Sequence, residues 1–208
     1  MLEEVLQKLS WLGHDCFKYS GPPVIYFDPY QLTDGDSADL ILITHEHFDH
    51  CSPGDVAKIQ LPDSVIVTTP SAAAQLSGTV IVLQPGEQTN AYGLTIETVP
   101  AYNLNKDFHP QKAGHLGFIV TINGVRLYHA GDTDFIPEMK GLKVDIALLP
   151  VSGTYVMTAA EAAEAARAIN PQIAIPMHYG AIVGSGSDAK TFKSLLEGQI
   201  RVEILPKD

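Results

Sequence analysis

The chain has 208 residues, of which 45% are hydrophobic and 18% are charged, and its formal net charge is −11 at pH 7. This length and composition predict a globular protein with one domain over residues 1–208 and a sizeable core. The acidic balance argues against nucleic acid as the main partner, because contacts with phosphates require many Lys and Arg side chains.

The chain also lacks the usual signals for export or membrane insertion. Its start, Met1 to Val5, has neither the basic segment nor the long apolar run of a signal peptide. No apolar run approaches the roughly 20 residues of a membrane helix. Only Cys16 and Cys51 occur, so no disulfide framework is implied. We therefore expect a cytoplasmic protein without membrane association, and a homo-oligomer is compatible with the sequence.

Strands and helices alternate through the first half of the chain. Alternating or apolar runs predict strands at 15–20, 24–29, 38–44, 65–69, 80–83 and 94–99. The first of these strands are closely spaced and predict an antiparallel meander. Short helices are expected at 53–59, with Ser52 as N-cap, and at 70–76. This alternation indicates an α/β layer rather than an all-β sandwich.

The second half shows the same alternation. Asn123-Gly124 separates two strand-like runs, 116–122 and 125–129, and is a strong hairpin signal. Further strands are predicted at 144–150, 172–176 and 201–205. Thr158 and Glu161 form a capping box for a helix that ends near Ile169, and Asp188 is expected to cap a last helix.

The stretch from His45 to His50, His-Glu-His-Phe-Asp-His, carries the chemistry of this chain. It follows the buried strand 38–44 and places three imidazoles and two carboxylates at the end of that strand. Imidazole and carboxylate together suit zinc, iron, manganese or nickel. His45 and His47 can reach one cation, whereas Asp49 and His50 come later in the turn and fit a second cation about 3.5–4 Å away.

Two later strands also end in residues that can bind a metal. The strand 125–129 leads into Gly131-Asp132, where glycine permits a close approach of the backbone. The strand 172–176 leads into His178. A carboxylate has two oxygens and can contact two cations, which a histidine cannot.

The His-x-His-x-Asp-His string resembles the signature of the metallo-β-lactamase-fold hydrolases. This resemblance implies an α/β fold, a four-layer αββα sandwich. Trp11-x-Gly13-His14, followed by a strand that ends in Asp28-Pro29, resembles the compact ascorbate-phosphate lactonase-like branch. That resemblance implies that His14 and Asp28 support the ligand imidazoles from behind and do not bind metal themselves.

The resemblance also implies two sets of ligands. One metal would take Asp49, His50 and His178, and the other His45 and His47, with Asp132 bridging the two. The family usually supplies a third histidine after the strand that ends near Val99. Here that place reads Pro100-Ala101-Tyr102-Asn103.

Four explanations of the missing ligand are open. His109 or His115 can fold in from the following loop, the side-chain carbonyl of Asn103 can take the place, or that metal is weakly held. We favour His109. His115 opens a strand and suits a structural role, and His129 is either buried or a support for the ligands.

These observations predict a metal-dependent hydrolase with two divalent ions, zinc first and manganese or nickel as alternatives. A water activated by the ions would attack a small-molecule ester, lactone or phosphate-bearing substrate. Asp49 and Asp132 would orient that water and are the predicted catalytic residues. The alternatives are an RNA or DNA phosphodiesterase of the same fold and a non-catalytic metal-binding regulatory protein.

Two loops are expected near the substrate. The irregular stretch 100–114 contains His109, Lys106 and Lys112, and is either a substrate-facing flap or an ordinary surface loop. The Gly/Ser stretch 180–186 is expected to border the site.

Overall fold

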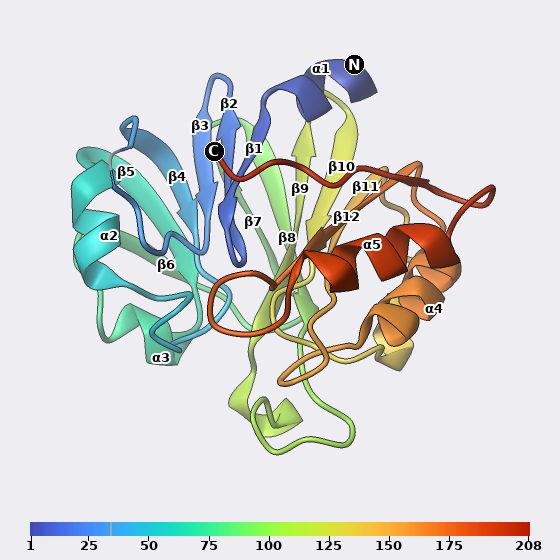
Figure 1. The fold of residues 1–208 in the computed structure, drawn as a ribbon. Helices are drawn as coiled ribbons and strands as arrows, with labels where there is room; N and C mark the ends of the chain where they lie inside the picture. The colour runs from blue at the N-terminus through green and yellow to red at the C-terminus, as the bar shows by residue number, and fades with distance from the viewer. Residues whose placement is uncertain (34) are drawn as a thin grey trace.

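Two β-sheets face each other and carry helices on both outer faces, as the computed structural model of the chain shows for residues 1–33 and 35–208 (Figure 1). The layers follow in the order helix, sheet, sheet, helix. The predicted αββα sandwich is therefore confirmed. No helix among these residues is long and apolar enough to span a lipid bilayer.

The first sheet contains six strands in chain order. They are β1 (Leu9–Gly13), β2 (Cys16–Ser20), β3 (Val24–Phe27), β4 (Ala38–Leu42), β5 (Gln60–Thr68) and β6 (Thr79–Val82). The strands β1 to β3 are antiparallel, as the predicted meander requires, and β3 to β6 are parallel. The central strand β4 is an almost continuous apolar run because both of its faces are covered.

The second sheet contains seven strands in the order β13-β12-β11-β10-β9-β8-β7. They are β7 (Gln88–Ala91), β8 (Leu94–Pro100), β9 (Leu116–Ile122), β10 (Val125–His129), β11 (Ile146–Pro150), β12 (Ile173–Met177) and β13 (Arg201–Val202). Ile122 pairs with Val125, and Asn123 and Gly124 both have positive φ, so the predicted two-residue hairpin is confirmed. The strand β7 was not predicted, because Gln88–Ala91 is polar and lies at a sheet edge.

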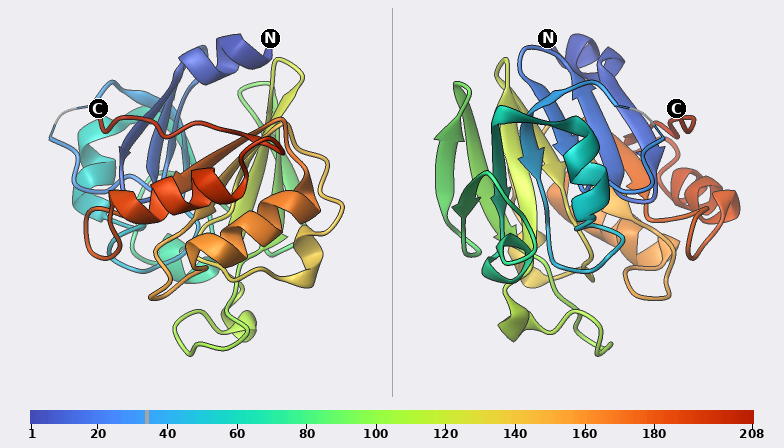
Figure 2. Two further views of the ribbon diagram at one scale, coloured as in Figure 1. Left: turned by 45° about the vertical axis from the view of Figure 1, so that its right-hand side comes forward. Right: turned by 90° about the vertical axis from the view of Figure 1, so that its left-hand side faces the viewer.

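Helices cover the two outer faces on opposite sides of the sandwich (Figures 1 and 2). The first sheet carries α2 (Pro53–Ile59) and α3 (Pro70–Ala73), and the second carries α4 (Ala159–Ile169) and α5 (Gly186–Leu195). A short helix α1 (Leu2–Gln7) precedes β1, and 3₁₀ turns occur at Gln111–Ala113 and Pro137–Met139.

Side-chain caps explain where these helices begin. The Thr158 hydroxyl accepts a hydrogen bond from the backbone of Glu161, which completes the predicted capping box of α4. The prediction for α5 was wrong in detail. Ser185 is the N-cap, and Asp188 is the third helical residue, whose carboxylate returns to the Ser185 backbone. The helix α3 ends at Ala73, earlier than predicted.

The main core lies between the sheets. Phe17 and Leu40 from the first sheet meet Phe118, Leu127 and Leu148 from the second, and all five are fully buried. Burial of each such side chain contributes about 1.5–3 kcal/mol relative to exposure.

A second apolar cluster packs α2 and α3 on the first sheet, through Ile41, Val56, Ile66 and Ala72. The two clusters together hold the strands in register. The ends of β4, β10 and β12 therefore come together at one edge of the sandwich, beside the loop that joins β8 to β9 (Figure 1).

Candidate metal centre

Asp28, at the end of β3, organises the turn that follows β4. One of its oxygens accepts a hydrogen bond from the Thr44 backbone at 2.8 Å, and the other accepts from the Thr44 hydroxyl at 2.7 Å. The second oxygen also lies 2.8 Å from Nδ1 of His50. Because the Thr44 hydroxyl donates to Asp28, it accepts from Nδ1 of His45, 2.9 Å away. Asp28 thus lies behind both imidazoles and leaves their Nε2 atoms facing inward.

His178 and His109 are oriented in the same manner. Nδ1 of His178 lies 2.8 Å from the Ser152 hydroxyl, and Nδ1 of His109 lies 3.1 Å from the side-chain oxygen of Asn103. Outer hydrogen bonds of this kind fix the tautomer and the direction of an imidazole that binds a metal. Four imidazoles from three separate loops therefore direct Nε2 toward one common space.

Asp132 occupies the middle of this space. Its Oδ1 lies 3.5 Å from Nε2 of His50, and its Oδ2 lies 3.2 Å from Nε2 of His178 and 3.3 Å from that of His109. The preceding Gly131 has φ near +64°, and a Cβ there would lie 2.8 Å from a backbone oxygen of Leu116. Glycine is therefore required at position 131 to bring Asp132 this close to the other strands.

His47 and Asp49 complete the predicted set on two sides of Asp132. Nδ1 of His47 lies 3.0 Å from Nε2 of His45 and 3.3 Å from Nε2 of His109. An oxygen of Asp49 lies 3.1 Å from Nε2 of His14 and 3.8 Å from Nε2 of His50. The structure thus brings together all seven predicted ligands, which are His45, His47, Asp49, His50, His109, Asp132 and His178.

The geometry distinguishes the candidates for the missing histidine. The Asn103 side-chain oxygen accepts hydrogen bonds from the backbone and the ring of His109, so it is not free to act as a ligand. Nε2 of His109 faces Asp132, whereas Nε2 of His115 lies 3.4 Å from a carboxylate oxygen of Glu46. The His115 ring stacks on His45 with centroids 4.7 Å apart. His115 therefore belongs to the cluster, which the interpretation of it as structural did not anticipate.

His14 borders the cluster, and its Nε2 lies 3.1 Å from an oxygen of Asp49. Its ring nitrogen and ligand atoms of Asp49, His50 and His178 all lie within 4.8 Å of one another. The next residue, Asp15, is fully buried and groups in the same way with His50, Asp132 and His178. Asp15 was not among the predicted ligands, although His14-Asp15 directly after a strand repeats the pattern seen at the end of β4.

The remaining histidine, His129, lies outside the cluster and is buried. Its Nε2 lies 2.9 Å from the backbone oxygen of Asp15, and its ring stacks on Phe27 with centroids 5.3 Å apart. Cys51 is also buried, and its sulfur lies 4.0 Å from the Ala72 backbone oxygen, under the helices. Both residues contribute to packing around the centre.

Burial and charge divide the imidazoles into two kinds. Burial lowers the pKa of His109 to about 4 and holds the pKa of His45 well below its ordinary value. Burial also lowers the pKa of His14 and of His115. These four rings are neutral at pH 7, the form in which imidazole binds a metal.

The other kind lies beside carboxylates. Burial opposes a charge on His178, but the charges of Asp132 and Asp15 outweigh it and raise the pKa of His178 to about 9. Burial likewise opposes a charge on His50, but Asp132 and Asp28 outweigh it and raise its pKa well above the ordinary value. Burial disfavours ionisation of Asp132, yet His178 and His50 hold its pKa well below the usual range.

The cluster fits divalent cations. Among the described residues, the buried polar atoms without a hydrogen-bond partner include both carboxylate oxygens of Asp15, Oδ1 of Asp132 and Nε2 of His50 and His178. Leaving such atoms unpaired in the interior is costly. All of them point into one cluster, and imidazole with carboxylate is the donor set of zinc, manganese and iron sites.

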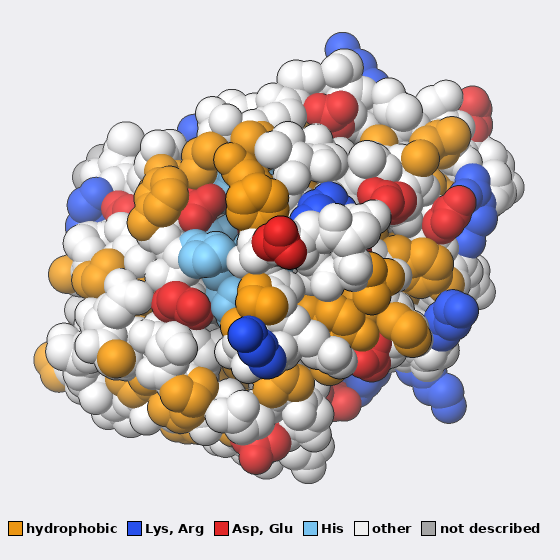
Figure 3. Space-filling view, turned by 90° about the horizontal axis from the view of Figure 1, so that it is seen from below, with side chains coloured by type: hydrophobic (Ala, Val, Ile, Leu, Met, Phe, Trp, Pro, Cys, Tyr) orange, Lys and Arg blue, Asp and Glu red, His pale blue; other side chains and the backbone are white. Residues whose placement is uncertain are grey.

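A hollow of about 400 Å³ opens over the centre. It is lined by His47, Phe48, Asp49, Phe108, His109, Asp132, Tyr155 and Ile182. Seen from below, imidazoles lie at the bottom of a depression with hydrophobic side chains around it (Figure 3). Phe108 belongs to the loop 101–115 and Ile182 to the loop 178–185, so both loops border the site. Another hollow, along α5, has no histidine in its lining.

An αββα sandwich with imidazoles and carboxylates gathered at its strand ends defines the class of metallo-β-lactamase-like proteins. Residues 8–178 match the family described as the beta-lactamase superfamily domain, and the chain belongs to this family.

Relatives of similar length support this membership. The chain is 36% identical to a UPF0173 metal-dependent hydrolase of Thermoplasma acidophilum, with 90% of each chain covered. It is 32% identical to another of Pyrococcus abyssi, with 95% of this chain and 96% of the other covered. The crystal structure of a proposed metal-dependent hydrolase from Parabacteroides distasonis superposes with a TM-score of 0.84, at 37% identity over 95% of this chain and 91% of the other. These names agree with the predicted class of enzyme.

Proposed function

We propose that this chain is a metal-dependent hydrolase that holds two divalent cations around Asp132 and cleaves a small-molecule ester, lactone or phosphoester. The observation that carries the proposal is the position of Asp132. Its two oxygens lie 3.2–3.5 Å from the Nε2 atoms of His50, His109 and His178, which come from three different loops.

The ligand sets follow from these neighbours. His45, His47 and His109 would hold one cation, and Asp49, His50 and His178 the other, with Asp132 shared between the two. Asp15 and His14 border the second set and are additional candidate ligands. Zinc is the first choice of metal because imidazoles predominate, and the carboxylates also suit manganese, with nickel a further alternative.

When bound, such a pair of cations lowers the pKa of a coordinated water toward about 7 and so supplies a nucleophile at neutral pH. Asp49 borders the hollow, with 14% of its side chain exposed, and would orient the attacking water and accept its proton. Asp132 would keep the two sets of imidazoles at a fixed separation. The hollow admits a small molecule, and a net charge of −11 disfavours a nucleic-acid substrate.

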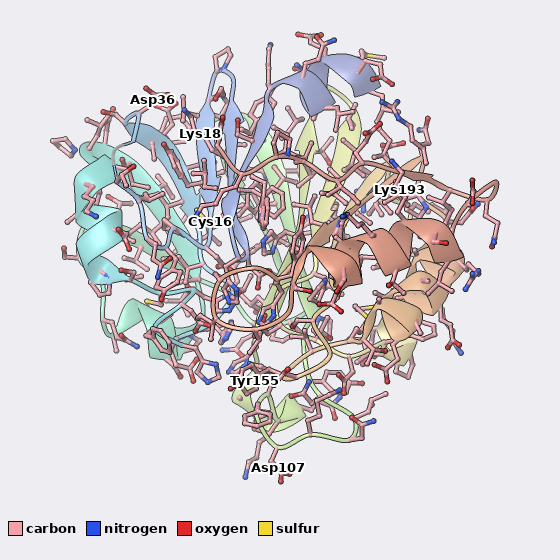
Figure 4. The ribbon with its side chains drawn as sticks, viewed as in Figure 1. Cys16, Lys18, Asp36, Asp107, Tyr155 and Lys193 are labelled. Carbon is pink, nitrogen blue, oxygen red and sulfur yellow. The ribbon has the colours of Figure 1, made fainter. Side chains whose placement is uncertain are left out.

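The test joins metal analysis with a screen for hydrolysis. Purified protein is loaded with zinc, manganese or nickel, its metal content is measured, and turnover of p-nitrophenyl acetate, a γ-lactone, p-nitrophenyl phosphate and bis-p-nitrophenyl phosphate is followed. We expect two metals per chain and metal-dependent turnover. Asp132→Ala should lose both the metals and the turnover. Asp107→Asn, at the exposed end of the loop 101–115, should lose neither (Figure 4).

Other outcomes would replace the proposal. Turnover of bis-p-nitrophenyl phosphate alone would favour a phosphodiesterase. Bound metal without turnover of any compound would favour a non-catalytic metal-binding protein. Wild-type activity in Asp132→Ala would refute the shared ligand.

A further inference from the structure

The mouth of the hollow over the metal centre is built from large apolar side chains. Phe48 is 67% exposed, Phe108 is 51% exposed and Ile182 is 39% exposed. Exposed apolar side chains scattered over a surface need no explanation, but a contiguous group around a cleft marks a binding site. These three, with Tyr155, come from four different loops and meet at one opening.

The aromatic rings of this mouth are held in place by neighbouring rings. Phe108 packs edge-on against Tyr155, with centroids 4.6 Å apart and planes at 79°. Phe48 packs edge-on against Tyr30, with centroids 6.0 Å apart and planes at 76°. Figure 4 shows Tyr155 between the sandwich and the loop that carries Asp107 at its outer end. Walls fixed in this way lose little freedom when a ligand binds.

The lining of this hollow, as far as the structure describes it, contains neither Lys nor Arg. Its charged members are Asp49 and Asp132. The nearby Lys106 contacts the buried Asp134 at 2.5 Å, and that pair ties the loop to the sandwich. A phosphate or carboxylate that lies in this mouth, away from the cations and the scissile bond, would need Arg, Lys or several backbone N–H groups for its recognition.

From these contacts we infer that the substrate is a neutral carboxylic ester or lactone whose apolar acyl or aryl group lies against Phe48, Phe108, Tyr155 and Ile182. This inference rests on the proposed hydrolase function and narrows it. Water adds its oxygen to the acyl carbon, and the bond from that carbon to the alcohol oxygen breaks. One water proton goes to the alcohol, and the acid retains the other or releases it to solvent.

The first test is a matched series of substrates with zinc-loaded protein. The p-nitrophenyl esters of acetate, butyrate and hexanoate differ only in chain length, and the monoester of glutarate adds a negative charge to a similar chain. We expect kcat/KM to rise about fourfold for each methylene that the hollow removes from water. The glutarate ester should be at least about 100-fold poorer than hexanoate, because its carboxylate would be an unpaired charge in the apolar mouth.

Variants then test whether the side chains of the mouth cause the preference for longer acyl chains. Phe108→Ala and Ile182→Ala should raise KM for hexanoate by about tenfold and leave KM for acetate nearly unchanged, which flattens the series. Leu104→Ala is the matched control, since Leu104 is 60% exposed on the same loop but does not line the hollow. A flat series in wild type, or a preference for the charged esters, would overturn the inference while the hydrolase remains.

A binding measurement keeps the inference testable if none of the compounds turns over. Calorimetric titration of zinc-loaded protein with 2-octanone, 2-butanone and 4-oxopentanoate uses ketones that cannot be hydrolysed. Tighter binding of 2-octanone, lost in Phe108→Ala, would support the apolar site even if the hydrolase were refuted. Equal binding of all three would overturn the inference.

Discussion

The side-chain oxygen of Asn103 accepts two hydrogen bonds from His109, one from its backbone N–H at 3.0 Å and one from its ring Nδ1 at 3.1 Å. The Asn103 amide nitrogen donates to Asp134 and to the Tyr155 backbone, so the orientation of the amide is fixed. Nε2 of His109 consequently faces His47 and Asp132. Asn103, three residues after the end of β8, thus positions a histidine six residues later, and this supplies the imidazole that the strand end itself lacks.

We predict that Asn103→Ala weakens metal binding without removing any ligand. The ring of His109 would lose its fixed tautomer and direction, and the loss of such a partner typically costs about 10–100-fold in metal affinity. This affinity is measured by competition with a chelator, using protein loaded with one cation per chain. Asn103→Gln keeps both the amide oxygen and the amide N–H groups and should retain more affinity than Asn103→Ala. Asn105→Ala, exposed on the same loop, is the control, and equal affinities in all three variants would contradict the prediction.

His109 and His115 should differ in their effect on metal content. Because His109 faces Asp132 and His115 faces Glu46, we predict that His109→Ala retains about one metal per chain and His115→Ala about two. Elemental analysis after gel filtration in metal-free buffer makes the measurement. If His115→Ala loses a metal and His109→Ala does not, the two roles are exchanged and the first ligand set must be rewritten around His115.

Most of the fold could be predicted because strands such as β4 and β12 are nearly continuous apolar runs and the hairpin at Asn123-Gly124 has an unambiguous turn. The strand β7 could not, since its alternation is polar and its pairing with β8 is set by tertiary contacts. The start of α5 was misplaced because Ser185 and Asp188 both suit an N-cap, and only the backbone shows that Ser185 occupies it.

The candidate site could be predicted wherever ligand-type residues follow a recognisable strand, as with His45 and His178. The contacts of His115, His14 and Asp15 could not, because they depend on how separate loops fold over one another. His115 stacks on His45, although a long stretch of chain separates the two. His14 and Asp15 take their places because His14 has a positive φ and its backbone oxygen accepts a hydrogen bond from the His178 backbone at the end of β12. Sequence spacing carries no information about such distances.

Asp15 should affect metal retention, although it stands outside the resembled motif. Its two oxygens are buried without a partner and lie beside His50, Asp132 and His178. We predict that Asp15→Asn lowers metal affinity by about tenfold or more, because a neutral amide is a poorer ligand than a carboxylate. Cys16→Ala alters the adjacent buried side chain, which packs under the first sheet, and should leave metal content unchanged. Unchanged affinity in Asp15→Asn would make Asp15 a structural residue.

Asp55 should stabilise the fold in a manner that depends on pH. It accepts hydrogen bonds from the backbone of Gln31 and Leu32 and from the side chains of Ser52 and Lys58. Burial disfavours its charge, but the bonds from Lys58, Ser52 and Gln31 outweigh burial and lower the pKa of Asp55 in the folded protein. We predict that Asp55→Asn lowers the free energy of unfolding by about 1–3 kcal/mol at pH 7.

The sign of the pH dependence follows from that lowered pKa. The unfolded chain binds a proton at Asp55 near its ordinary pKa of about 3.9, whereas the folded chain resists protonation until a lower pH. The stabilising contribution is therefore fully present above about pH 5 and disappears as pH falls through the folded pKa. Urea unfolding of metal-free protein between pH 3 and 7 should show wild type and Asp55→Asn converging at the acid end. The Asp107→Asn variant, altered at an exposed position, should follow wild type at every pH. If the difference in the free energy of unfolding between wild type and Asp55→Asn does not change with pH, the contacts listed above do not lower the pKa of Asp55.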